Sequence, residues 1–210
     1  MTESPIDERR AHWERVYHGK SPVELSWFQE HPTLSMDLMA ATGLGADAAI
    51  VDVGGGASVL ADHLLAAGFT NIAVLDVADG ALAQARHRLA ERSELITWIT
   101  TDVTTWRPDR RYDLWHDRAV LHFLTDPADQ AAYGQTLRAV LKPGGWAIIA
   151  GFAPGGPERC SGLPIVQHAA DSLRTVLGNA FVLVEARDER HVTPRGATQA
   201  FRSHLLRFGV

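Results

Sequence analysis

The chain has 210 residues, of which 46% are hydrophobic and 21% are charged, and its formal net charge at pH 7 is −5. This composition is typical of a soluble globular protein with a substantial core, and the acidic balance argues against a broad nucleic-acid footprint, which needs a basic face. The N-terminal residues lack an apolar signal-peptide core, and no apolar run approaches the roughly 20 residues that cross a bilayer. The single cysteine, Cys160, excludes an intrachain disulfide. We therefore expect a cytoplasmic protein with no membrane partner.

The first 45 residues are predicted to form a helical cap or lid. Residues 7–19 favour a short polar helix that ends at Gly19, residues 20–31 favour a loop, and residues 32–42 favour a second helix with one apolar face.

Short apolar runs alternate with helical segments between residues 46 and 152, the predicted cofactor-binding core. The apolar runs, expected to be strands, are residues 49–53, 72–76, 95–100, 112–116 and 146–152, and the helical segments between them are residues 58–67, 79–92 (with Asp79 as N-cap) and 127–141. This alternation predicts βαβ units and a parallel sheet with helices on both faces. The nearly unbroken apolar runs fit strands that are buried on both sides.

The remaining residues, 153–210, are predicted to supply a substrate-side loop and terminal strands. Residues 153–164 are rich in proline and glycine and contain Cys160, which could help to wall a substrate pocket. A helix is expected at 168–178, and residues 181–193 and 197–208 are expected to pair in antiparallel fashion. The whole chain is therefore predicted to be one α/β domain: a doubly wound, mostly parallel seven-stranded sheet with helices on both faces and an antiparallel C-terminal strand.

A glycine loop, Gly54-Gly55-Gly56, follows the first predicted strand and precedes a helix. Glycine lets a ligand approach the backbone closely, and the N–H groups of a helix N-terminus favour an anion. Asp76 stands at the end of the next predicted strand, where an acid can accept hydrogen bonds from ribose hydroxyls. An adenosine-containing ligand is therefore expected.

The dinucleotide fingerprint G-x-G-x-x-G fails in both possible registers, because Val59 or Ser58 stands where a glycine is required. The acid Asp52 before the loop would repel a pyrophosphate but suits a ligand with positive charge, such as S-adenosylmethionine with its sulfonium and ammonium groups. The residues alone leave two alternatives open: a dinucleotide-dependent oxidoreductase and a non-catalytic S-adenosylmethionine-binding protein.

Four motifs resemble those of class I S-adenosylmethionine-dependent methyltransferases, which have a Rossmann-like fold. They are Asp52-x-Gly54-x-Gly56, Asp76 after the second strand, Thr101-Asp102-Val103 after the third, and Leu141-Lys142-Pro143-Gly144-Gly145 before the fifth. The resemblance covers roughly residues 45–152. Ser58 departs from it, because many members have a third glycine there, although a serine can still cap the following helix.

The resemblance implies that S-adenosylmethionine is the cofactor, that S-adenosylhomocysteine is the product, and that the acceptor is a small molecule or a protein side chain. It places Gly54 and Gly56 against the homocysteine part, Asp76 on the ribose and Asp102 on the adenine amino group. The full set of expected cofactor-binding residues is Trp13, Tyr17, Trp27, Asp52, Gly54, Gly55, Gly56, Ser58, Asp76, Val77, Asp102, Val103, Asp117 and Arg118. The histidines show no metal-ligand spacing, so no metal site is expected.

A narrower resemblance concerns the N-terminal segment. His12-Trp13-Glu14-x-x-Tyr17 and Leu25-Ser26-Trp27-Phe28 are similar to the segment that closes over the cofactor in a subgroup containing protein-lysine methyltransferases of the elongation-factor and citrate-synthase type. Asp117-Arg118-Ala119 departs at two of three positions from the Asp-Lys-Gly run of those enzymes. The aromatic residues could wall the methyl-transfer pocket or anchor the lid, and both roles stay open.

Two residues near the end of the fourth predicted strand are candidates for catalysis. That edge of an open α/β sheet faces the ligand crevice. His122 is the candidate general base, because imidazole is suited to proton transfer near neutral pH, and Asp117 is the candidate for orienting an amine or the cofactor. A packing role for His122 and a structural ion pair between Asp117 and Arg118 are the alternatives.

Overall fold

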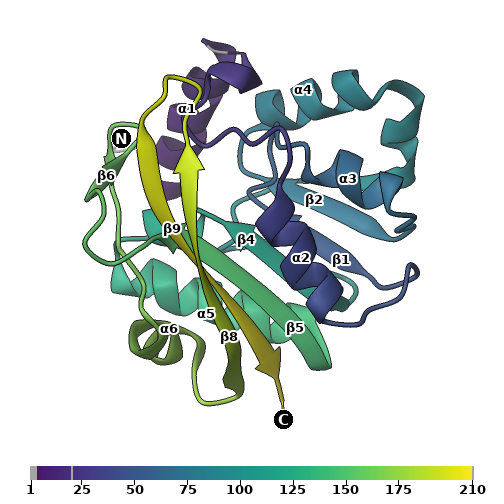
Figure 1. Cartoon of the computed structure of the whole chain (residues 1–210), viewed down its shortest axis with the longest axis vertical. Coiled ribbons are helices and arrows are strands. Elements are labelled where there is room, and N and C mark those ends of the chain that lie inside the picture. Colours follow the sequence, from purple (N-terminus) through teal and green to yellow (C-terminus); the bar gives the residue numbers. More distant parts are fainter. Residues whose placement is uncertain (1–3, 20, 210) are drawn as a thin grey trace.

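A seven-stranded sheet runs through the centre of the molecule in the order β3-β2-β1-β4-β5-β9-β8 (Figure 1). The computed structural model describes residues 4–19 and 21–209. The strands are β1 (Ile50–Val53), β2 (Ile72–Asp76), β3 (Ile96–Thr100), β4 (Tyr112–Arg118), β5 (Leu141–Phe152), β8 (Phe181–Val192) and β9 (Thr198–Phe208), and a small hairpin pairs β6 (Arg159–Cys160) with β7 (Leu163–Pro164). The first five strands of the large sheet are parallel, and β9 is antiparallel to both β5 and β8. The predicted α/β fold is confirmed.

Helices cover both faces of this sheet. They are α1 (Pro5–His18), α2 (Thr33–Ala41), α3 (Leu60–Ala66), α4 (Asp79–Leu89), α5 (Pro127–Val140) and α6 (Ala170–Leu177), with 3₁₀ turns at Pro22–Glu24, Ala90–Leu95 and Leu121–Phe123. Hydrophobic cores lie on both faces of the sheet, and alternate residues of β1 point into them. Val51 packs in the core with α5 and α6, and Ile50 packs in the core with α2, α3 and α4. Burial on both faces explains why the strands of the core are almost continuously apolar.

Several element ends differ from the sequence prediction by a few residues, and the starts of α1, β5 and α4 have a clear physical explanation. α1 begins at Pro5, because the Ser4 side chain accepts a hydrogen bond from the Asp7 N–H and caps the helix. β5 begins at Leu141, which already pairs with Tyr112, and the chain departs from the ladder before Trp146 rejoins it. The N-terminus of α4 is capped by Glu14 of α1, which accepts from the Asp79 N–H at 2.7 Å, so the prediction that Asp79 is the N-cap is wrong.

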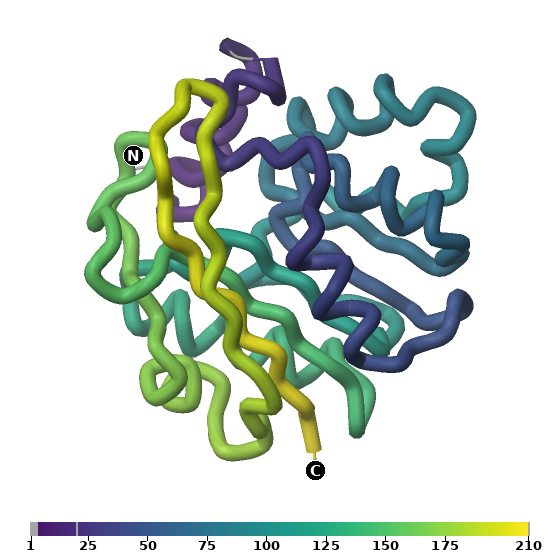
Figure 2. Tube along the Cα trace, in the orientation of Figure 1, coloured from purple at the N-terminus to yellow at the C-terminus, as the bar shows by residue number. Residues whose placement is uncertain are grey.

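The N-terminal segment passes beside the β8–β9 hairpin (Figure 2). Gln29 Nε2 donates to Glu189 Oε1 at 2.7 Å, and the His191 ring lies 2.7 Å from the carbonyl oxygen of Ser26. None of the described helices has the length and apolar character that a membrane span requires.

The strand order of the sheet also indicates the edge at which a ligand is expected to bind. β1 lies between β2 and β4, so the strand order reverses at β1, and such a reversal opens a crevice at the carboxyl ends of the strands. Val53 is paired with Leu75 and with Asp117, so the residues that follow these three strands gather at one edge.

Candidate active site

The glycine loop after β1 adopts a backbone that side chains would obstruct. Gly54 and Gly56 have φ values of 68° and 43°, in the left-handed region. A Cβ at Gly54 would lie 2.0 Å from Val120 Cγ2, and one at Gly56 would lie 2.8 Å from Asp76 Oδ2. The loop is therefore a cradle that only glycine can form. Ser58 Oγ accepts from the Leu60 N–H at 3.1 Å just before α3, but the N-cap residue of this helix is Val59, so Ser58 is not the cap that was expected.

Asp76 is buried at the end of β2, beside this loop. Its Oδ1 accepts from the Ala78 N–H at 2.9 Å, and its Oδ2 faces Gly56. Burial, together with the nearby charge of Asp52, raises the pKa of Asp76 to about 7. Such a carboxyl group is stabilised in its charged form by ligand hydroxyls that donate hydrogen bonds.

Asp102, after β3, is tied to the N-terminal helix. Its Oδ1 accepts from the N–H and hydroxyl of Thr104 at 2.8 and 2.6 Å, and its Oδ2 accepts from Arg9 Nε at 2.8 Å. Arg9 also contacts Asp129 at the start of α5. α1 is thus fastened across the edge of the site where Asp102 lies.

Asp52 belongs to a buried polar chain that sequence reasoning missed. Its Oδ1 lies 2.7 Å from Nδ1 of His116, and Nε2 of the same ring lies 2.9 Å from Ser35 Oγ. This geometry fits an imidazole that donates to Asp52 and accepts from Ser35. The pairing of β1 with β4 puts Asp52 opposite His116, a signal that strand order would have supplied. Nothing in the sequence points to Ser35, which arrives from α2.

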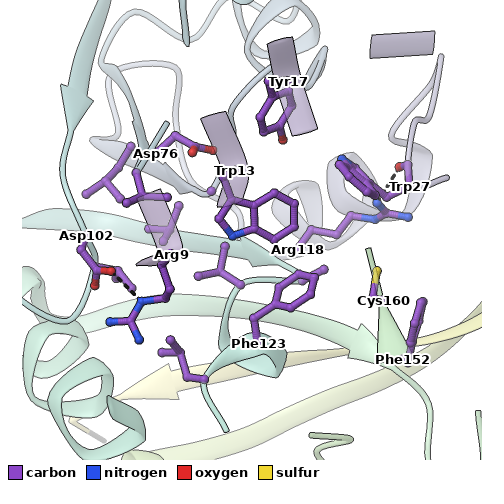
Figure 3. Close-up of a pocket in the computed structure, with 18 of the residues that line it drawn as sticks. Arg9, Trp13, Tyr17, Trp27, Asp76, Asp102, Arg118, Phe123, Phe152 and Cys160 are labelled. Atoms are coloured by element: carbon purple, nitrogen blue, oxygen red, sulfur yellow. Dashed lines mark hydrogen bonds and ion pairs between the residues drawn. The ribbon is translucent and has the colours of Figure 1, made fainter. Parts of the chain in front are cut away.

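Two adjoining cavities follow the carboxyl edge of the sheet, and the larger one is drawn in Figure 3. Of the predicted cofactor residues, the larger cavity is lined by Trp13, Tyr17, Trp27, Gly54, Asp76, Val77, Asp102, Val103 and Arg118. The smaller cavity is lined by Asp52, Gly55 and Ser58, and shares Tyr17, Trp27, Gly54 and Arg118 with the larger one. Gly56 and Asp117 lie behind these walls. Sequence reasoning missed Arg9, Phe123, Phe152, Gln199 and Phe201, which also line the larger cavity; Cys160 lines it as expected.

Asp117 is fully buried and its oxygens are occupied by the protein. Oδ1 accepts from the Val120 N–H at 2.7 Å, and Oδ2 accepts from the Leu121 N–H at 3.0 Å and the Tyr133 hydroxyl at 2.7 Å. Burial raises the pKa of Asp117 to about 6. The carboxylate holds the turn after β4, in which Ala119 has a φ of 75°. No ion pair between Asp117 and Arg118 is found among the described residues.

His122 is buried beneath the cavity, not on its surface. Its ring packs at 4.2 Å from the Phe123 ring and 5.4 Å from the Phe152 ring. Neither ring nitrogen has a hydrogen-bond partner within residues 4–19 and 21–209. Burial, with a contribution from His168, lowers the pKa of His122 to about 3, so the ring is neutral at pH 7.

Arg118 lies where the two cavities meet. Nη1 donates to the Trp27 carbonyl at 3.0 Å, Nη2 lies 3.8 Å from Glu189, and the guanidinium stands 4.5 Å over the Phe201 ring. These contacts fix a positive charge in the wall of an otherwise largely aromatic and aliphatic chamber.

The comparisons with known proteins agree with this geometry. Residues 50–145 match a family model described as a methyltransferase domain. No curated protein matches the chain in sequence.

Several solved structures have a similar fold. An S-adenosylmethionine-dependent methyltransferase from Anabaena variabilis ATCC 29413 has a TM-score of 0.75 and 15% identity, with coverage of 99% of this chain and 96% of that one. The N-methyltransferase NodS from Bradyrhizobium japonicum WM9, in complex with S-adenosyl-L-homocysteine, has a TM-score of 0.72 and 18% identity, with 94% and 98% coverage. A structure from work on the conversion of a disulfide bond into a thioacetal group during echinomycin biosynthesis has a TM-score of 0.76 and 21% identity, with 95% and 92% coverage.

Proposed function

We propose that this chain, a class I S-adenosylmethionine-dependent methyltransferase, methylates a small molecule that enters the larger cavity. The matched methyltransferase domain and the shared fold give the enzyme class and the cofactor. S-adenosylmethionine supplies an electrophilic methyl group on a sulfonium sulfur.

The cofactor is proposed to lie along the carboxyl ends of β1, β2 and β3. The homocysteine part lies in the smaller cavity against the glycine loop, near Asp52. The ribose hydroxyls donate to Asp76, and the adenine lies between Val77 and Val103 with its amino group toward Asp102. The observation that carries this arrangement is the cradle at Gly54 and Gly56 next to a buried carboxylate whose Oδ2 faces it.

The acceptor is proposed to occupy the other end of the larger cavity, between Phe152, Cys160 and Phe201. A lysine side chain would bring a positive charge toward Arg118, and two like charges in a largely buried chamber repel each other. The narrower resemblance to protein-lysine methyltransferases has no support among the comparisons. The similarity to a structure from echinomycin biosynthesis supports a small-molecule acceptor.

Methyl transfer needs little covalent participation by the chain. A lone pair on the acceptor forms the new bond to the methyl carbon, the carbon–sulfur bond breaks, and its electron pair stays on the sulfur of S-adenosylhomocysteine. The residues of the cavity hold the reacting atoms in line and exclude water. Asp117 is proposed to act by fixing the turn that carries Arg118. The role of His122 as a base stays a prediction, because its neutral ring lies behind Phe123.

Calorimetric titration of the full chain tests the cofactor assignment. We expect S-adenosylhomocysteine to bind and NADH not to bind. Asp76→Ala should weaken S-adenosylhomocysteine binding by roughly 10- to 100-fold, since a hydrogen bond to a charged group contributes roughly 1.5–3 kcal/mol. Asp109→Ala, on the exposed loop before β4, is the matched control. Binding of NADH alone would overturn the function, and an unchanged dissociation constant in Asp76→Ala would overturn the ribose contact.

A further inference from the structure

We propose that the methyl acceptor carries a carboxylate or a similar anionic group, and that Arg118 anchors this group at the acceptor end of the larger cavity. This inference rests on the proposed function, because it assumes that the cofactor fills the part of the cavity near Asp76 and Asp102. It adds the chemical class of the acceptor and gives Arg118 a role in specificity.

The first observation is that the Arg118 guanidinium is held rigidly but uses few of its donors. A guanidinium has five N–H donors, and among the described residues one hydrogen bond is made, from Nη1 to the Trp27 carbonyl. Nη2 is buried and has no hydrogen-bond partner in the described part of the chain. The Phe201 ring beneath the guanidinium fixes its plane. A buried donor without a partner is costly, and a ligand that accepts from it removes that cost.

Glu189 does not remove this capacity. Its distance of 3.8 Å from Nη2 is that of an ion pair, but it is too long for a hydrogen bond. The Glu189 carboxylate is itself held by Gln29, which donates to it at 2.7 Å. Burial lowers the pKa of Arg118 to about 10, so the group still carries its charge at neutral pH. Arg118 therefore presents a fixed cation with donors to spare.

The second observation is independent of Arg118. Gln199, on β9, lines the same cavity, and its buried Oε1 has no partner among residues 4–19 and 21–209. An amide group can turn so that its NH₂ faces the ligand instead. Cys160 lines the same end, and burial raises the pKa of its thiol, so it adds no negative charge. Of the groups that line this end, Arg118 is charged and Gln199 can turn its NH₂ toward a ligand, so an anion is favoured over a cation.

The rest of this end of the cavity defines the body of the acceptor. Phe123, Phe152 and Phe201 supply aromatic walls, and Figure 3 shows Phe123, Phe152 and Cys160 on the same side of the cavity as Arg118. Aromatic walls fit a flat, apolar ligand. The Arg118 guanidinium fits a carboxylate at one end of that ligand, because arginine pairs with carboxylate through two parallel hydrogen bonds.

The rival ligand for Arg118 is the carboxylate of the cofactor, since Arg118 lines both cavities. The contacts of the guanidinium favour the acceptor. Phe201, which packs against the guanidinium, lines the larger cavity and not the smaller one, and Glu189 belongs to the same β8–β9 hairpin.

The test uses the full chain saturated with S-adenosylhomocysteine and two probes of the same shape, 2-naphthoate and its neutral amide 2-naphthamide. Trp13 and Trp27 line the cavity, so tryptophan fluorescence reports binding, and calorimetry checks it. We expect naphthoate to bind at least tenfold more tightly than naphthamide. Arg118→Met should abolish this preference, and Arg195→Met, an equal charge change at the exposed hairpin turn, should keep it. Equal binding of the two probes, or saturable binding of neither, would overturn the inference.

Two further measurements separate the possible failures. Arg118→Met should bind S-adenosylhomocysteine and 5′-methylthioadenosine, which lacks the amino-acid part, as the wild type does. A loss of affinity for S-adenosylhomocysteine alone would assign Arg118 to the cofactor and overturn the inference. A wild-type protein that binds no S-adenosylhomocysteine would instead overturn the proposed function. Arg118→Gln, which keeps a donor for the Trp27 carbonyl, repeats the test should the methionine variant not fold.

Discussion

Gly54 meets two separate steric demands at the centre of the site. Its φ of 68° strains any residue with a Cβ, and that Cβ would lie 2.0 Å from a methyl group of Val120. Gly68 has a φ of 90° but open space around it, so a side chain there would strain the backbone without overlapping a neighbour. The two glycines therefore separate backbone strain from steric overlap.

We expect Gly54→Ala to lower the free energy of unfolding by roughly 2–4 kcal/mol, because overpacking adds to the strain of a positive φ. Gly68→Ala should cost about 1 kcal/mol. Urea unfolding measures both values. In a double-mutant cycle with Val120→Ala, the second change should restore part of the loss at Gly54 and none of the loss at Gly68. Equal costs for the two glycine variants would contradict the steric explanation.

Asp76 should make cofactor binding depend on pH. Its pKa is raised to about 7 in the free protein, mainly by burial, and the ribose hydroxyls donate to its charged form. Binding therefore favours the deprotonated carboxylate, and the affinity for S-adenosylhomocysteine should fall as the pH drops from 8 to 6, approaching about tenfold per unit below the pKa. Calorimetry at several pH values measures this, and Asp76→Asn should flatten the profile. A wild-type profile as flat as that of the variant would exclude Asp76 from the contact.

At the scale of the elements, the sequence predicts what is local and misses what is brought together by folding. The alternation of apolar runs locates all five strands between residues 49 and 152. Four of these strands are largely buried, and β3, at the edge of the sheet, still packs Ile96, Trp98 and Ile99 against the two cores. The motif acids can be found because the residues after parallel strands must gather at one edge. The cap of α4 by Glu14 and the contact of His116 with Ser35 join elements far apart in the chain, and no local pattern reports them.

The N-terminal helix is attached to the cofactor-binding core by polar contacts and faces the cavity with aromatic side chains. Arg9 pairs with Asp102, and Gln84 of α4 donates to the Tyr17 carbonyl at 2.7 Å. Trp13 lines the cavity, and its ring centroid lies 4.9 Å from that of Phe123. The same residue therefore forms part of the pocket wall and packs α1 against the core. Tyr17 is the residue of α1 that is buried, and we propose that α1 is a lid which these polar contacts hold in its closed position.

Binding of S-adenosylhomocysteine should therefore slow amide hydrogen exchange in residues 5–18. The reason is that the bound molecule would add contacts to Trp13 and Tyr17, which stabilise the closed position of α1. Mass spectrometry of deuterated peptides measures the change, and α6, packed against α5 and absent from the cavity walls, is the internal reference. Unchanged exchange in α1, or equal slowing in α6, would contradict a lid.

At the scale of the whole molecule, burial of titratable groups sets opposing responses to acid. The pKa values of His122 and His168 are lowered to about 3 and about 4, chiefly by burial, whereas those of Asp76 and Asp117 are raised to about 7 and about 6. Between about pH 4 and pH 6 the folded state binds fewer protons at the histidines than the unfolded state does, and more at the aspartates. Acid therefore destabilises the fold through the histidines and stabilises it through these two aspartates.

A single substitution can isolate the histidine contribution. The stability that neutral His122 contributes is complete above its unfolded pKa of about 6.5 and is lost as the pH falls toward about 3. His122→Phe removes this titration from a site walled by Phe123 and Phe152, and leaves the two aspartates unchanged. A plot of the unfolding free energy against pH should then have a slope that is lower by about 1 kcal/mol per pH unit between pH 4 and pH 6. Urea unfolding at several pH values measures the slopes, with His87→Phe, at an exposed position on α4, as the control. Parallel pH profiles for wild type and His122→Phe would mean that His122 is not held neutral by burial.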